Sequence, residues 1–113
     1  MNASVLKKIV GDDEATVREF LAFFRQTAHR QRAEMHAAGA EGDGRHAAAV
    51  AHKLQSSSRS IGAETLSCLC AAIENAGAAG DLAAVRALLA AFDAEWQREE
   101  ADINTYLGDG AQR

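Results

Sequence analysis

The best candidate for a reactive side chain in this sequence is the imidazole of His52, inside the alanine-rich segment 47–54. If this segment is a helix that advances about 100° per residue, His52 lies about 200° from Val50, so its ring points outward. The buried stripe of the same helix then comprises Val50, Leu54, Ser57 and Ile61. An exposed imidazole is a titratable group that a partner protein could reach.

Small side chains surround this imidazole on the predicted helix. The same face carries Arg45, Ala48, Ala49, Gln55, Ser56 and Arg59. Alanine and serine leave the ring standing clear of its surroundings, while Arg45 and Arg59, about two turns away on either side, could bind acidic groups of a partner. A solvent-exposed histidine without a function is the alternative interpretation of this pattern.

A longer run around His52 resembles the signature of histidine phosphotransfer (HPt) domains, A-H-x-L-K-G-S-S-x-x-x-G-A. The corresponding residues are Ala51-His52-Lys53-Leu54-Gln55-Ser56-Ser57-Ser58-Arg59-Ser60-Ile61-Gly62-Ala63. The histidine, the leucine, the paired serines and the closing Gly-Ala fall in register. The resemblance extends from about Val5 to Leu107 and implies a four-helix bundle that exposes the active histidine on its second long helix.

The chain departs from this signature at two positions. Gln55 stands where the family often has a lysine, and Ser56 stands where it often has a glycine. Because the family's lysine is thought to lie near the phosphoryl group, its absence predicts slower transfer or a positive charge supplied instead by Lys53 or Arg59. Serine in place of glycine is a smaller change, which leaves a partner protein slightly less space to approach the histidine.

The resemblance also assigns a role to Glu74, because family members commonly carry a glutamate or glutamine on the following helix that binds Nδ1 of the histidine. On the helical wheel Glu74 lies about 90° from the buried stripe of its own helix, on the flank where it could lean toward His52. A solvated acid near a helix end is the alternative for this residue.

The chemistry that the resemblance implies is phosphoryl transfer. Nε2 of His52 would accept a phosphoryl group from the aspartyl phosphate of a receiver domain and pass it to a response-regulator aspartate, while Glu74 at Nδ1 would fix the reactive tautomer. The Mg²⁺ and the acidic cluster that assist this transfer belong to the receiver, so no metal or cofactor is expected here. The chain has neither a G-x-x-x-x-G-K-[ST] loop nor a G-x-G-x-x-G turn, so we expect a carrier loaded by a receiver domain or a hybrid sensor histidine kinase, not an ATP-dependent enzyme.

The elements that must position these residues are predicted to be helices. In chain order we expect a short helical start at Val5–Val10, a long helix from Ala15 to about Ala38, a helix from Asp43 to about Ser60, a short helix from Ala63 to Ala76 and a long helix that begins at Asp81. The apolar stripes outside the His52 helix comprise Val17, Phe20, Leu21, Phe24, Ala28 and Met35, then Leu66, Leu69, Cys70 and Ile73, then Val85, Leu88, Leu89, Phe92, Trp96, Ile103 and Tyr106. One stripe per helix and short connections predict an all-α, antiparallel up-down four-helix bundle that forms a single domain over residues 1–113, ordered over about 5–107.

Capping residues and glycines set the predicted ends of these helices. Asp43 and Asp81 are expected to cap helix starts, as is the acidic segment 11–14. The segment 39–44, with three glycines, is expected to be a loop, while Gly62 and Gly77 are expected to end helices. We expect the tail from Gly108 onward to fray.

Composition excludes several classes of protein. The 113 residues are 48% hydrophobic and 25% charged and include no proline, which fits one soluble helical domain. Sixteen acidic residues against 12 scattered basic ones give a net charge of -4, which disfavours nucleic-acid binding. No apolar run approaches the ~20 residues of a membrane span, so we expect a cytoplasmic protein. Cys68 and Cys70 diverge on a helix and are expected to fill buried or half-buried space.

Two other functions remain open at this stage. A metal-binding bundle is disfavoured, because the chain lacks paired Glu-x-x-His motifs and His29, His36 and His46 are expected at the surface or its boundary. A helical adaptor that docks a receiver or another signalling protein through the His52 face without phosphorylation is kept open by Gln55. The helices use their single stripes internally, so we expect a monomer.

Overall fold

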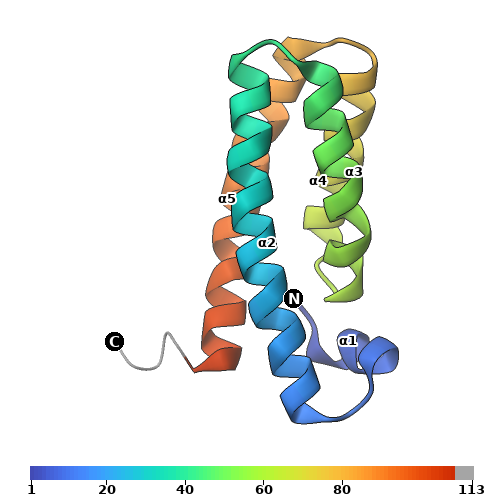
Figure 1. Cartoon of the computed structure of the whole chain (residues 1–113), viewed down its shortest axis with the longest axis vertical. Coiled ribbons are helices and arrows are strands. Elements are labelled where there is room, and N and C mark those ends of the chain that lie inside the picture. The colour runs from blue at the N-terminus through green and yellow to red at the C-terminus, as the bar shows by residue number, and fades with distance from the viewer. Residues whose placement is uncertain (109–113) are drawn as a thin grey trace.

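The computed structural model describes residues 1–108 as four long helices with a short helix across one end (Figure 1). The helices are α1 (Ala3–Val10), α2 (Glu14–Ala40), α3 (Gly44–Ser60), α4 (Glu64–Ala78) and α5 (Leu82–Leu107). Consecutive long helices run in opposite directions. The predicted all-α bundle with a short N-terminal helix is therefore confirmed, whereas the predicted fraying of the tail falls almost entirely outside the described residues.

Aspartates cap the N-termini of three of the long helices by accepting hydrogen bonds from backbone amides. Asp13 accepts from the amide of Thr16, at 3.2 Å, and Asp43 accepts from that of His46, at 3.0 Å. Asp81 accepts from the amide of Ala84, at 3.1 Å. These amides have no partner within the helix, so each aspartate both satisfies a donor and sets where its helix begins.

Three glycines occupy positions that differ from the prediction. Gly39 and Gly77 lie inside α2 and α4 as buried helical residues, and Gly44 is the first residue of α3. The left-handed turns after α2 and α4 fall at Gly42, with φ of 76°, and at Gly80, with φ of 74°. The predicted left-handed helix end at Gly62, with φ of 75°, is confirmed. A glycine inside a helix is disfavoured locally, but at Gly44 and Gly77 the missing Cβ lets α3 and α4 come close, and that packing outweighs the local preference.

The core follows the predicted stripes closely. Buried apolar residues from every helix form one cluster, in which the ring of Phe24 packs edge-on against Trp96 at a centroid distance of 6.1 Å. Of the predicted stripe residues, those that are only partly buried are Phe20, Ser57, Leu69, Leu88 and Tyr106. The deviations lie at the margins of the stripes, where the position of the neighbouring helix decides burial.

Two small side chains differ from the prediction. Ser58, not Ser57, is the fully buried serine of α3. Cys68 is exposed, whereas Cys70 is buried and its burial raises the pKa of its thiol to about 12. The buried side chains of Ser58 and Cys70 lie next to each other between α3 and α4. Cys68, two residues earlier on α4, points away from this contact.

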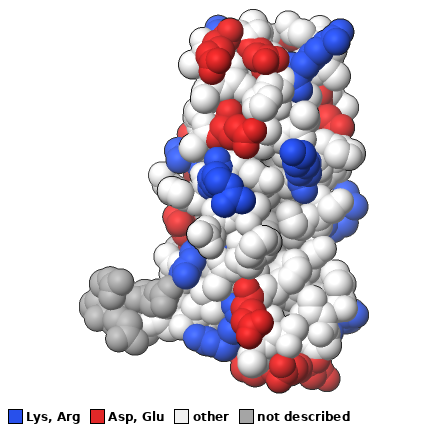
Figure 2. All heavy atoms as spheres, viewed as in Figure 1, with Lys and Arg blue, Asp and Glu red and all other residues white. Residues whose placement is uncertain are grey.

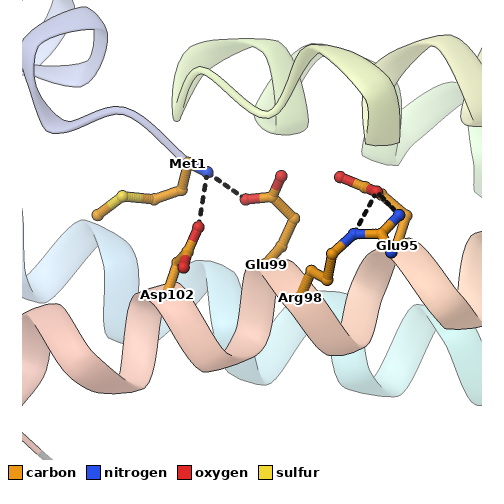
Figure 3. A network of polar contacts seen from close by, with 5 residues as sticks. All are labelled: Met1, Glu95, Arg98, Glu99 and Asp102. Carbon is orange, nitrogen blue, oxygen red and sulfur yellow. Dashed lines mark hydrogen bonds and ion pairs between the residues drawn. The ribbon is translucent and has the colours of Figure 1, made fainter.

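The first residues fasten α1 to the bundle. The amide of Asn2 donates to the carbonyl of Ile61 at 2.7 Å. The amino group of Met1 forms an ion pair with Glu99 and lies 3.6 Å from Asp102 (Figure 3). Burial raises the pKa of Glu99, although the Met1 ammonium acts in the opposite direction. These contacts close the end of the bundle far from the turn between α2 and α3.

Candidate functional site

Helix α3 holds His52 at its outer surface. Val50 and Leu54, two residues to either side, are buried in the core, whereas the side chain of His52 is 69% exposed. The periodicity of the helix produces this contrast, because a shift of two residues turns a side chain by about 200°. The predicted outward position of His52 is confirmed.

Glu74 on α4 reaches the imidazole of His52. Its Oε2 lies 2.8 Å from Nδ1 of His52, and its side chain is half-buried. Glu74 can face α3 because the adjacent residue Ile73 turns into the core. Within residues 1–108, the other ring nitrogen, Nε2, has no hydrogen-bond partner. The site therefore has one nitrogen held by a carboxylate and one free to react.

A surface hollow of about 600 Å³ opens beside this pair. It is lined by Arg45, Ala48, Ala49, His52, Lys53, Glu74 and Ala78. Its three alanines leave room next to the ring, and its two basic side chains offer positive charge on the α3 side. The hollow thus combines an exposed nucleophilic nitrogen with space and charge for an anionic group.

The structure divides the residues that the sequence assigned to partner binding. Arg45, Ala48, Ala49 and Lys53 line the hollow with His52, whereas Gln55, Ser56 and Arg59 do not. Ser56 and Arg59 are exposed, and Gln55 is half-buried with its carbonyl accepting a hydrogen bond from Ser67 at 3.2 Å. The three lie further along α3, toward its C-terminal end.

Two residues of the hollow differ from the sequence analysis. Ala48 was expected on an exposed face, but it is only 7% exposed because α4 packs against it. Ala78 was not identified, because the short helix predicted from Ala63 was expected to end at Ala76, whereas α4 extends to Ala78. Its position four residues after Glu74 places it on the same side of α4, so a helical wheel extended past Gly77 would have included it.

The surface around the bundle carries both signs of charge. On the face seen in Figure 2, basic and acidic side chains alternate with broad uncharged areas and do not form a single basic band. A surface of this kind fits recognition of a protein partner better than recognition of a phosphate backbone.

The other histidines lie elsewhere. His46 presents Nε2 to Oε2 of Glu34 at 2.8 Å, and His36 presents Nε2 to Oδ1 of Asp93 at 2.9 Å. Both rings are partly exposed and His29 is exposed, as predicted for residues at the surface or its boundary. Among the described residues there is no group of three or more His, Cys, Asp and Glu side chains that could hold a metal ion.

Comparison with known protein families gives one match. The family model described as Hpt domain matches residues 19–102, a range that includes both His52 and Glu74. No curated protein and no solved structure matches the chain. No helix within the described part of the chain is long and apolar enough to cross a membrane.

Proposed function

The chain belongs to the Hpt domain family, and we propose that His52 accepts a phosphoryl group from the aspartyl phosphate of a receiver domain and passes it to a response-regulator aspartate. The observation that carries this assignment is the contact between Nδ1 of His52 and Glu74 beside a highly exposed ring. The protein is then a phosphoryl carrier of a two-component phosphorelay, and a phosphoprotein for part of its cycle.

The geometry suits a nucleophile at Nε2. A neutral imidazole has one protonated and one unprotonated nitrogen, and a carboxylate beside Nδ1 favours the proton on Nδ1. The lone pair then lies on Nε2, at the exposed tip of the ring. Glu74 positions the ring in this tautomer and balances the positive charge that develops on it during attack.

The transfer step balances without a further reactant. The Nε2 lone pair forms a bond to phosphorus as the bond between phosphorus and the receiver's aspartyl oxygen breaks, which leaves that aspartate as a carboxylate. The Nδ1 proton remains on the ring, so the phosphorylated imidazole is cationic and lies against Glu74. Reversal of the same step on a second receiver restores neutral His52 and forms a new aspartyl phosphate.

Positive charge on the chain would come from Arg45 and Lys53, because both line the hollow beside His52. Gln55 occupies the position where the family often has lysine, and Arg59, the other predicted substitute, is not part of the hollow. We therefore assign Arg45 and Lys53 to the phosphoryl group and to acidic side chains of the receiver. The receiver would supply Mg²⁺ and the rest of the charge stabilisation.

Placement in the cytoplasm belongs to this proposal, since receiver domains and the kinases that load them act there. The sequence has no phosphate-binding glycine loop for ATP, so the partner loads the carrier.

The test is to incubate the protein with a phosphorylated receiver domain, and separately with ATP alone, and to follow acid-labile, alkali-stable phosphate on the protein. We expect label only with the receiver, no label on His52→Gln, and normal label on the control His46→Gln. His46 is the matched control because it lies on the same helix but presents Nε2 to a carboxylate.

The opposite result would identify the adaptor function. If several phosphorylated receivers bind the protein but none transfers phosphate to it, and if His52→Gln binds them as well as the natural protein does, the carrier proposal is wrong. The absence of the family's lysine at position 55 would then be the first feature to examine.

A further inference from the structure

Helices α3 and α4 come close together between Gly44 and Gly77, near the His52 site. A Cβ added at Gly77 would lie 2.2 Å from the backbone oxygen of Gly44 and 3.0 Å from Cβ of Ala48. The first distance is far below ordinary van der Waals contact, and the obstacle is backbone, which cannot rotate away. Gly77 is therefore the residue that allows α4 to lie this close to α3.

This close approach is adjacent to the contact between His52 and Glu74. Ala48 precedes His52 by four residues on α3, and Gly77 follows Glu74 by three residues on α4, so each pair shares a helix face. Because the two helices are antiparallel, the pair Ala48 and Gly77 and the pair His52 and Glu74 are successive steps along one interface. A change in helix separation at Ala48 and Gly77 therefore also changes the separation at His52 and Glu74.

We propose that Gly77 is a positioning residue for the His52 site, because its missing Cβ sets the helix separation at which Glu74 reaches Nδ1. The role assigned to this contact rests on the proposed phosphotransfer function. An alanine at position 77 would have to move α4 away from Gly44 by more than an ångström to reach ordinary contact distance. The present Nδ1 to Oε2 distance of 2.8 Å leaves little room for such a movement before the contact is lost.

Glycine at this position is otherwise unfavourable, which supports the inference. Gly77 lies inside α4, where alanine is the better helix former, and its φ is not positive. Neither the backbone conformation nor the local helix preference requires glycine here. The closeness of α3 does.

The experiment is ¹⁵N NMR of the histidine rings in the natural protein and in Gly77→Ala, which reports which ring nitrogen carries the proton. We expect the neutral ring of His52 to be protonated mainly at Nδ1 in the natural protein. We expect the proton to shift toward Nε2 both in Gly77→Ala and in Glu74→Ala. His36 and His46 are internal references, since their Nε2 atoms face carboxylates, and their signals should not change.

Gly39→Ala is the matched control. Gly39 is also a buried glycine inside a helix, but a Cβ there meets only the flexible side chain of Leu89, at 3.3 Å. This variant should leave the His52 tautomer and the rate of phosphate uptake unchanged, whereas Gly77→Ala should slow uptake about as much as Glu74→Ala does.

A folded Gly77→Ala protein with the natural His52 tautomer would overturn the proposal. If circular dichroism shows that Gly77→Ala does not fold, Gly44→Ala replaces it, because a Cβ at Gly44 lies 3.0 Å from the backbone oxygen of Gly77. An unchanged His52 tautomer in that variant would then overturn the proposal. The ring measurement needs no receiver, so a failure of phosphotransfer in the natural protein would refute the proposed function without deciding the role of Gly77.

Discussion

Three histidine–carboxylate pairs bridge neighbouring helices within residues 1–108, and they differ in which ring nitrogen meets the carboxylate. Between α3 and α2, His46 presents Nε2 to Glu34 at 2.8 Å. Between α3 and α4, His52 presents Nδ1 to Glu74 at 2.8 Å. Between α2 and α5, His36 presents Nε2 to Asp93 at 2.9 Å. The residue types are the same in kind, but only His52 keeps the nitrogen at the tip of the ring free. For the proposed phosphotransfer, proximity of a histidine to an acid is therefore not sufficient, and we expect the orientation of the ring to be the deciding feature.

The His36–Asp93 pair and the His52–Glu74 pair also differ in the charged groups around them. Asp93 also accepts a hydrogen bond from Nε of Arg32 at 2.6 Å. Burial alone would raise the pKa of Asp93, but the hydrogen bonds and charges of Arg32 and His36 outweigh it and hold the pKa below its usual value. Both pairs border a surface hollow, of about 290 Å³ at His36 and Asp93 and about 600 Å³ at His52 and Glu74. In the α2–α5 pair, however, Nε2 of His36 and Nε of Arg32 both meet Asp93, so this network satisfies its own charges. We interpret the α2–α5 pair as structural and the α3–α4 pair as reactive.

The largest difference between the two pairs should appear in the rate of phosphate uptake when each carboxylate is removed in turn. Glu74→Ala should slow phosphate uptake from a phosphorylated receiver by about 10-fold or more, because the ring loses the partner that sets its tautomer. Asp93→Ala should leave the rate within about twofold, because transfer depends on positioning at the reacting ring. Single-turnover transfer assays on both variants measure this, and equal rates in the two would break the comparison.

Stability should show the reverse order and depend on pH. Asp93→Asn should lower the free energy of unfolding at pH 7 by about 1 kcal/mol, while Glu74→Gln should change it by less than about 0.5 kcal/mol. The folded pKa of Asp93 is depressed, so its contribution is complete above the usual carboxyl pKa and is lost as the pH falls through the folded value.

Urea denaturation at pH 7 and at pH 3 tests this prediction. The difference between Asp93→Asn and the natural protein should shrink at the lower pH. A penalty that is the same at both values would mean that the charge of Asp93 is not what stabilises the contact.

The smallest effect should come from the basic residues near each pair. Lys53→Ala should slow association with a phosphorylated receiver about two- to fivefold at low salt, because Lys53 lines the hollow beside His52. Arg32→Ala should leave association unchanged, since Arg32 is engaged by Asp93. Stopped-flow binding at two salt concentrations would show the difference, which added salt should reduce. A salt-independent loss in both variants would contradict the assignment of charge to the hollow.

Much of the fold follows from local features of the sequence. The aspartate caps at Asp43 and Asp81 and the apolar periodicity give the helices and their inward faces, because each feature acts within a few residues. The exposure of His52 follows for the same reason, since Val50 and Leu54 on its own helix fix its direction. The family resemblance adds Glu74 as a candidate partner, which the angular position of that residue allowed but did not require.

Only the tertiary structure decided how α3 and α4 meet. The burial of Ala48, the place of Gly77 inside α4, the inclusion of Ala78 in the hollow and the contact of Glu74 with Nδ1 of His52 all depend on the separation of two helices. Periodicity gives the direction in which a side chain points, but it does not give the distance to a neighbouring helix. That distance is set by side-chain volume at the interface, and here the missing Cβ of Gly77 makes it short.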